Sequence, residues 1–141
     1  MRITTIVISI AIVSFVAMLA ACGGSRPSSN EKTIKSTKSG DITISLSSAG
    51  GDIKSGENEL VLSFNAASGK PMEVPAASLK FHMPAMGSMA EMNDLATLTT
   101  TETPGKFRAL VNIEVAGSWE AMISFQGPLG TEQATMSVTA K

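Results

Sequence analysis

Cysteine and histidine, which supply many metal ligands, nucleophiles and bases, are almost absent from this sequence. Its 141 residues contain one cysteine, Cys22, and one histidine, His82. A single cysteine cannot form an intramolecular disulfide, and a usual zinc site needs several Cys, His or carboxylate ligands. A Ser-His-Asp triad would have to use His82, and no serine lies in a nucleophile-elbow context.

An excess of charge of one sign is also lacking. Eleven basic and twelve acidic residues give a formal net charge of −1, and the scattered lysines form no basic patch for nucleic acid. The acidic residues occur singly, so no pair of catalytic carboxylates stands out. No glycine-rich loop of the phosphate-binding type is present. We therefore expect a protein that is not an enzyme and does not bind nucleic acid.

Residues 1–21 have the pattern of a signal peptide. Arg2 precedes an apolar run from Ile6 to Leu19, which is short for a membrane-spanning helix. The segment Leu19-Ala20-Ala21-Cys22 resembles the lipobox of bacterial lipoproteins, whose cysteine receives a diacylglycerol thioether and becomes the mature N-terminus. We therefore predict lipidation at Cys22, and an ordinary free thiol is the alternative.

Lipidation at Cys22 predicts a protein that is anchored to a membrane at the cell envelope and does not span it. Gly23, and not Asp, follows the cysteine. By analogy with lipoprotein sorting, this favours the outer membrane, facing the periplasm, in a Gram-negative cell. In other cells the expected location is the outer face of the cytoplasmic membrane. Residues 22–40 are rich in Gly, Ser, Lys and Thr, which predicts a flexible tether.

From residue 41 to 141, apolar residues alternate with polar ones, as in half-buried β-strands. Turn-forming residues separate these segments, and Thr103-Pro104-Gly105-Lys106 is the clearest turn. Trp119 is expected in the core. The pattern predicts an all-β, immunoglobulin-like sandwich of about seven strands, with a barrel as the alternative. The expected strands are 42–46, 59–64, 78–83, 94–102, 107–115, 119–125 and 134–138.

The stretch from His82 to Met92 holds the one histidine and four of the nine methionines, at positions 83, 86, 89 and 92. Pro84 and Gly87 interrupt regular structure, so these methionines are expected on a loop. Thioether sulfur is a soft ligand that selects Cu(I), which gives the hypothesis of a copper site. Methionine also fills irregular gaps in cores, and packing is the more common role of such a cluster.

Strand alternation divides the candidate ligands. If 78–83 is one strand, Met83 points inward with Leu79 and Phe81, and His82 points outward. The preferred ligand set is then His82 with two or three of Met86, Met89 and Met92, and Met83 is the least favoured member. Cu(I) accepts two to four soft donors, and a thioether needs no deprotonation to bind. The candidate metal ligands are His82, Met86, Met89, Met83 and Met92.

Three motifs occur in order along this part of the chain. They are Leu79-Lys80-Phe81-His82-Met83-Pro84-Ala85-Met86-Gly87-Ser88-Met89, Pro104-Gly105-Lys106-Phe107-Arg108-Ala109 and Gly117-Ser118-Trp119-Glu120-Ala121. They resemble the YtkA-like domain family, which is related to the FixH-like proteins. In that family an M-P-x-M stretch precedes a Gly-x-Tyr/Phe turn and a Gly-x-Trp strand start. The resemblance extends from about Asp41 to the end of the chain.

The resemblance implies an exported or membrane-tethered immunoglobulin-like sandwich that is associated with copper handling, including supply to oxidases and heavy-metal efflux. Residue by residue, it carries over to His82, Met83, Met86 and Met89, whereas Met92 rests on local spacing. The expected function is to bind Cu(I), or to pass it to a copper-handling partner protein. The alternative is a structural or protein-interaction module without a metal.

Overall fold

Nine β-strands and no α-helix make up residues 30–141, the part of the chain that the computed structural model describes. This confirms the all-β class, although the strands outnumber the seven expected. The predictions for residues 1–21 and Cys22 lie outside the described residues. The strands are β1 (Lys32–Ser39), β2 (Ile42–Ser48), β3 (Gly56–Ala66), β4 (Ala77–Met83), β5 (Met92–Leu95), β6 (Thr97–Thr100), β7 (Lys106–Ile113), β8 (Gly117–Gly127) and β9 (Gly130–Ala140).

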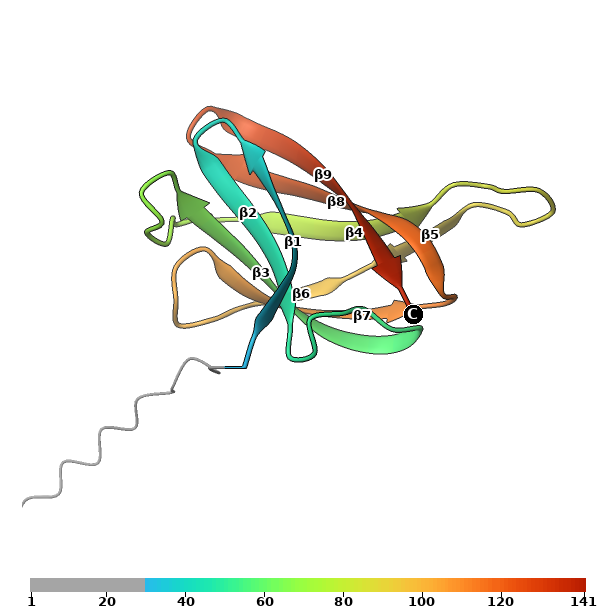
Figure 1. Ribbon diagram of the computed structural model, residues 1–141. Coiled ribbons are helices and arrows are strands. Elements are labelled where there is room, and N and C mark those ends of the chain that lie inside the picture. Colours follow the sequence, from blue (N-terminus) through green and yellow to red (C-terminus); the bar gives the residue numbers. More distant parts are fainter. Residues whose placement is uncertain (1–29) are drawn as a thin grey trace, which may run out of the picture.

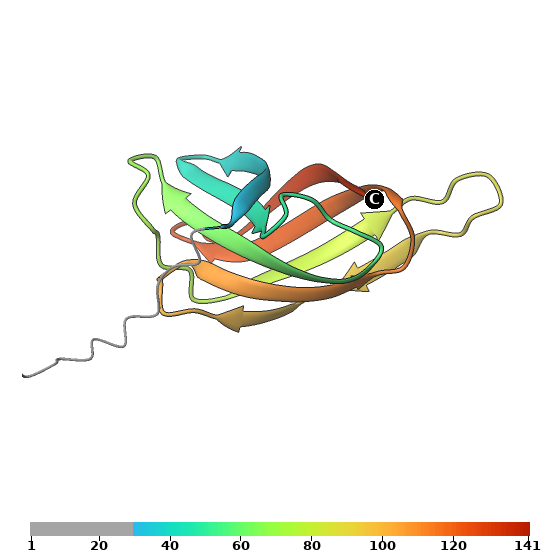
Figure 2. The same cartoon turned by 60° about the horizontal axis from the view of Figure 1, so that its bottom comes forward.

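Two antiparallel sheets pack face to face as a β-sandwich, as the views in Figures 1 and 2 show. The strand order is β1-β2-β3-β7-β6 in the larger sheet and β5-β4-β8-β9 in the smaller one. Because side chains alternate between the faces of a strand, each sheet turns its apolar residues toward the other. The largest fully buried side chains include Trp119, Phe64, Phe81, Phe125, Ile44 and Leu46.

The buried hydrophobic residues of the described chain all lie between Ile42 and Ala140. Residues 30–141 therefore contain a complete hydrophobic core, which is what a domain needs to fold by itself. No helix among these residues is long and apolar enough to cross a bilayer.

The last part of the predicted tether is wrong, because Lys32–Ser39 forms β1. This strand pairs antiparallel with β2, and its register shifts between Thr33 and Lys35. β1 is an edge strand with mostly exposed side chains, so it lacks the apolar alternation that reveals a half-buried strand. Ile34 alone packs against the core from the inner side.

The single strand expected over 94–102 is also wrong, because two short strands from different sheets occupy this region. β5 pairs with β4, whereas β6 pairs with β7 in the other sheet. Between them, the buried Ala96 donates its backbone N–H to the Leu79 carbonyl at 2.9 Å. The chain therefore crosses between the sheets at this residue and covers one side of the core.

The predicted turn at Thr103–Lys106 is confirmed. The Lys106 N–H donates to the Thr103 carbonyl at 3.2 Å, and Gly105 has φ of 68°. Proline at the second position and a positive φ at the third are the features of a type II turn. Trp119 is buried, as expected, with 1% of its surface exposed, and its indole N–H donates to the Val115 carbonyl at 3.1 Å.

Candidate functional site

The methionine-rich stretch forms a hairpin loop that extends beyond the end of the sandwich. We call residues 84–91 the Met arm, because they join β4 to β5 and carry two methionines. Figures 1 and 2 both show this loop, in yellow-green, projecting away from both sheets. Every residue of the arm is exposed. The prediction that these methionines lie on a loop and not on a helix is confirmed for Met86 and Met89.

At the tip of the Met arm, Met86 and Met89 form a reciprocal backbone pair. The Met86 N–H donates to the Met89 carbonyl at 3.1 Å, and the Met89 N–H donates to the Met86 carbonyl at 2.9 Å. The turn between them is Gly87-Ser88, and Gly87 has φ of 57°. A two-residue hairpin turn needs a positive φ at its first central residue, so glycine at this position allows the tip to close tightly.

The backbone pair brings the Cβ atoms of two methionines to one face of the tip. Residues directly opposite each other on antiparallel strands project to the same face, with Cβ atoms about 5 Å apart. The Met86 side chain is 58% exposed and that of Met89 is 44% exposed. Neither packs in the core, and both are open to a soft ligand or a partner.

Met83 and Met92 have a different environment at the base of the arm. They face each other across β4 and β5. Met83 is only 3% exposed, and Met92 is partly buried against the same core. The Met83 Cε also lies 3.0 Å from where a Cβ on Gly117 would stand. The inward orientation predicted for Met83 is therefore confirmed, and both residues serve packing in this structure.

His82 lies on the outer face of the smaller sheet, as strand alternation predicts. Its Nδ1 is 3.0 Å from the Asn93 Oδ1. In the neutral tautomer that carries its proton on Nδ1, the ring donates to the Asn93 amide oxygen, and Nε2 keeps its lone pair for a metal.

The histidine and the tip methionines do not form one cluster. The tip pair keeps the register of the two strands, since Met86 lies three residues after Met83 and Met89 three residues before Met92. In an extended hairpin, the Cα atoms of His82 and Met86 are then about 13 Å apart. Among residues 30–141, no three His, Cys, Asp or Glu side chains gather at metal-binding distance. By the spacing of the backbone, the candidate ligands separate into a tip pair and an imidazole about 13 Å away.

Two neighbours of His82 were not predicted from the sequence. Asn93 on β5 and Glu120 on β8 each pair directly with His82 across the sheet. Their proximity to His82 depends on which strands pair and in which register. A single sequence contains no signal for that pairing.

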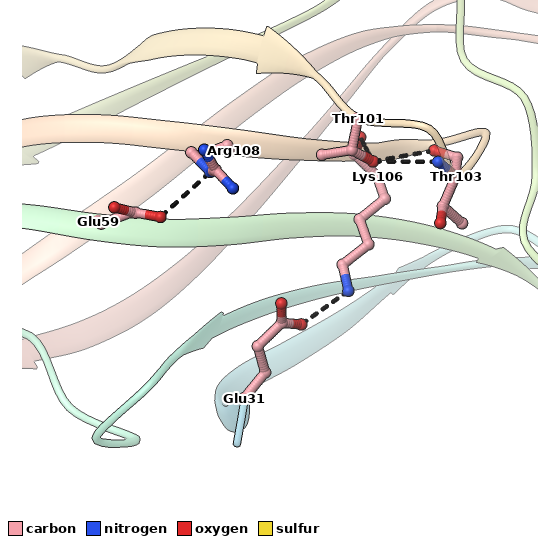
Figure 3. Close-up of polar contacts among 6 residues, drawn as sticks. All are labelled: Glu31, Glu59, Thr101, Thr103, Lys106 and Arg108. Atoms are coloured by element: carbon pink, nitrogen blue, oxygen red, sulfur yellow. Dashed lines mark hydrogen bonds and ion pairs between the residues drawn. The ribbon is translucent and has the colours of Figure 1, made fainter. Parts of the chain in front are cut away.

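A second surface feature is a shallow groove of about 930 Å³ on the outer face of the larger sheet. Figure 3 shows that both basic side chains of the groove are paired with carboxylates: Lys106 Nζ lies 2.8 Å from Glu31 Oε2, and Arg108 Nε lies 3.1 Å from Glu59 Oε1. Thr101 also donates its hydroxyl to the Lys106 carbonyl at 2.8 Å. Because Lys106 and Arg108 are already paired with carboxylates, the groove is a weaker candidate site than the Met arm.

Replacing Lys106 with methionine is expected to lower the free energy of unfolding by no more than about 1 kcal/mol. The ion pair with Glu31 joins β7 to the start of β1 but is partly exposed, and such pairs contribute little. Methionine keeps the apolar stem. Urea denaturation measures the change, with Arg108→Met as the more exposed control. A loss above about 2 kcal/mol for Lys106→Met alone would show that the pair holds β1 in place.

Comparison with known proteins adds the relationship of this chain to others. The profile of the YtkA-like family matches residues 36–124, which is more than half of the chain and includes both β4 and the Met arm. Searches of curated proteins and of solved structures found no match. The matched region starts within β1 and ends within β8, so it contains most of both sheets. The chain belongs to the YtkA-like family.

Proposed function

We propose that this protein binds Cu(I) at the tip of the Met arm and passes it to a copper-handling partner at the cell envelope. The observation that supports the proposal is the pairing of Met86 with Met89, two exposed thioethers on one face of a hydrogen-bonded turn. Thioethers are soft donors and favour Cu(I) over hard cations. Copper is here the cargo, and the protein performs no catalysis.

The open position of the tip suits transfer. Two thioethers leave the remaining coordination positions of a bound Cu(I) ion accessible, so a donor from a partner can enter before the first ligands leave. Copper then moves by ligand exchange, without release into solution. His82 is a separate nitrogen donor at the base of the hairpin, and it can receive the ion only if the arm bends toward the outer sheet face.

The cellular location is part of the same proposal. A lipid on Cys22 would hold the domain at a membrane surface of the envelope, with the outer membrane favoured in a Gram-negative cell. Neither the anchor nor the signal peptide lies within the described residues. A direct test is mass spectrometry of the purified full-length protein, which would detect the acyl chains on the N-terminal cysteine.

The copper proposal is tested by titrating residues 30–141 with Cu(I) against a chelator of known affinity. We expect Met86→Leu combined with Met89→Leu to weaken binding at least about tenfold, because leucine keeps the bulk and apolarity but lacks the sulfur. Met122→Leu is the matched control, since Met122 is exposed on β8, away from the arm. Its affinity for Cu(I) should equal that of the wild type.

Two results would contradict the proposal: a wild-type domain that fails to compete with the chelator, or a double variant that binds Cu(I) as tightly as the wild type. Either result would favour the alternative function, a protein-interaction module whose exposed methionines contact an envelope partner through their flexible side chains. The burial of Met83 and the partial burial of Met92 in the same hairpin show that methionine also serves packing here.

A further inference from the structure

The Met arm offers a Cu(I) ion two soft donors and no third. The other methionines of this hairpin lie at its base, where Met83 is buried in the core and Met92 is partly buried against it. His82 is about 13 Å from the tip in the extended hairpin. An ion held by Met86 and Met89 alone is therefore coordinatively unsaturated, because Cu(I), with a filled d shell, readily takes four ligands in a tetrahedral arrangement.

The surface around the tip pair is small and almost uncharged. The arm contains Ala85, Gly87, Ser88 and Ala90, and its one ionisable side chain is Glu91, next to β5. Two copies of this tip can approach each other without repulsion between like charges at the tip and without a bulky side chain between them. The arm projects beyond both sheets (Figure 1). When two tips meet, the two sandwiches therefore stay apart from each other.

We infer that Cu(I) joins two copies of this chain through their Met arms, so that Met86 and Met89 of both copies surround one ion with four thioethers. This inference rests on the proposed function and names the second source of donors. A two-fold axis through the ion makes the two tips equivalent, which is the commonest symmetry of a protein dimer. A partner chosen by charge would need a charged tip, and this tip is neutral.

Such a dimer combines a storage state with a transfer state. Each copy contributes one bidentate half of the site, so an incoming partner can replace one copy while the other still holds the ion. If both copies are anchored to the same membrane, their local concentration is raised. A weak contact between the two Met arms is then enough to join them.

The test uses residues 30–141 and Cu(I) alone, under anaerobic conditions with a reductant. Sedimentation equilibrium gives the mass of the protein, and the chelator competition gives the copper bound per chain. We expect a monomer without copper and a doubled mass with one ion bound per two chains. Removal of copper by excess chelator should restore the monomer. Met86→Leu combined with Met89→Leu should remain a monomer, whereas Met122→Leu should dimerise like the wild type.

Three other results overturn the inference. The mass of the protein and the copper bound per chain distinguish them. A monomer that binds one Cu(I) per chain overturns the dimer but leaves the copper-binding proposal intact. A domain that binds no Cu(I) overturns both. A dimer that forms without copper, or that persists in the double variant, shows that the arms are not joined by thioether coordination.

Discussion

Gly105→Ala is expected to lower the free energy of unfolding by about 2–5 kcal/mol, as the sum of a conformational and a steric cost. Part of the loss is conformational, because an alanine in the left-handed region costs about 1–2 kcal/mol, and Gly105 has φ of 68°. The rest is steric: a Cβ at this position would lie 1.8 Å from the Met72 carbonyl oxygen. Relieving such a clash costs about 1–3 kcal/mol.

The position of Gly105 explains why its neighbours cannot easily move. The Gly105 carbonyl accepts the Phe64 N–H at 2.8 Å, and the Phe64 carbonyl accepts the Met72 N–H at 3.0 Å. The turn, the end of β3 and the segment after it are thus joined in one set of backbone hydrogen bonds. Any shift that makes room for the new Cβ strains these bonds.

Gly40→Ala is the matched control, because Gly40 has φ of 55° but open space around its missing Cβ. Only the conformational part of the loss, about 1–2 kcal/mol, should appear there. Urea unfolding followed by the fluorescence of Trp119, the one tryptophan, measures both variants. Equal losses in the two variants would contradict the steric argument and leave only the cost of the positive φ.

Met83→Ala is expected to cost about 2–5 kcal/mol of unfolding free energy, whereas Met86→Ala, three residues later, should change it by less than about 0.5 kcal/mol. Met83 is 3% exposed within the core, and truncating it leaves a cavity. Met86 is 58% exposed, and truncating it removes no packing. The same unfolding experiment measures both values.

Copper binding should show the reverse order. Met86→Ala should weaken Cu(I) binding, while Met83→Leu, which retains most of the core volume, should bind Cu(I) like the wild type. A Met83→Leu variant with a clear loss of affinity would place Met83 among the ligands. Equal unfolding energies for Met83→Ala and Met86→Ala would contradict the division of the hairpin into a packed base and an exposed tip.

Much of the fold could be predicted from alternation, since a strand with one face in the core needs apolar residues at every second position. β4, β7 and β8 follow this rule and were predicted close to their observed bounds. β1 was missed because an edge strand with polar side chains on both faces has no such pattern. The division of residues 94–102 between two sheets was not predicted. Threonine is favourable in a strand of either sheet, so this threonine-rich segment does not reveal that the chain crosses at Ala96.

The candidate site was partly predictable for the same reason. Strand alternation alone placed Met83 inward and His82 outward, because successive side chains on a strand point to opposite faces. Pro84 and Gly87 predicted the loop. The pairing of Met86 with Met89 and the contact between His82 and Asn93 depend on hairpin register, which aligns residues that are apart in the chain.

By itself, the sequence determined the all-β class, the turn at Gly105, the burial of Trp119 and the identity of the few soft donors. These depend on local rules: the period of two along a strand and the φ that each turn position requires. Only the tertiary structure decided which methionines stand together. Strand pairing set Met86 beside Met89 at an exposed tip, while packing buried Met83 in the core and partly buried Met92 against it.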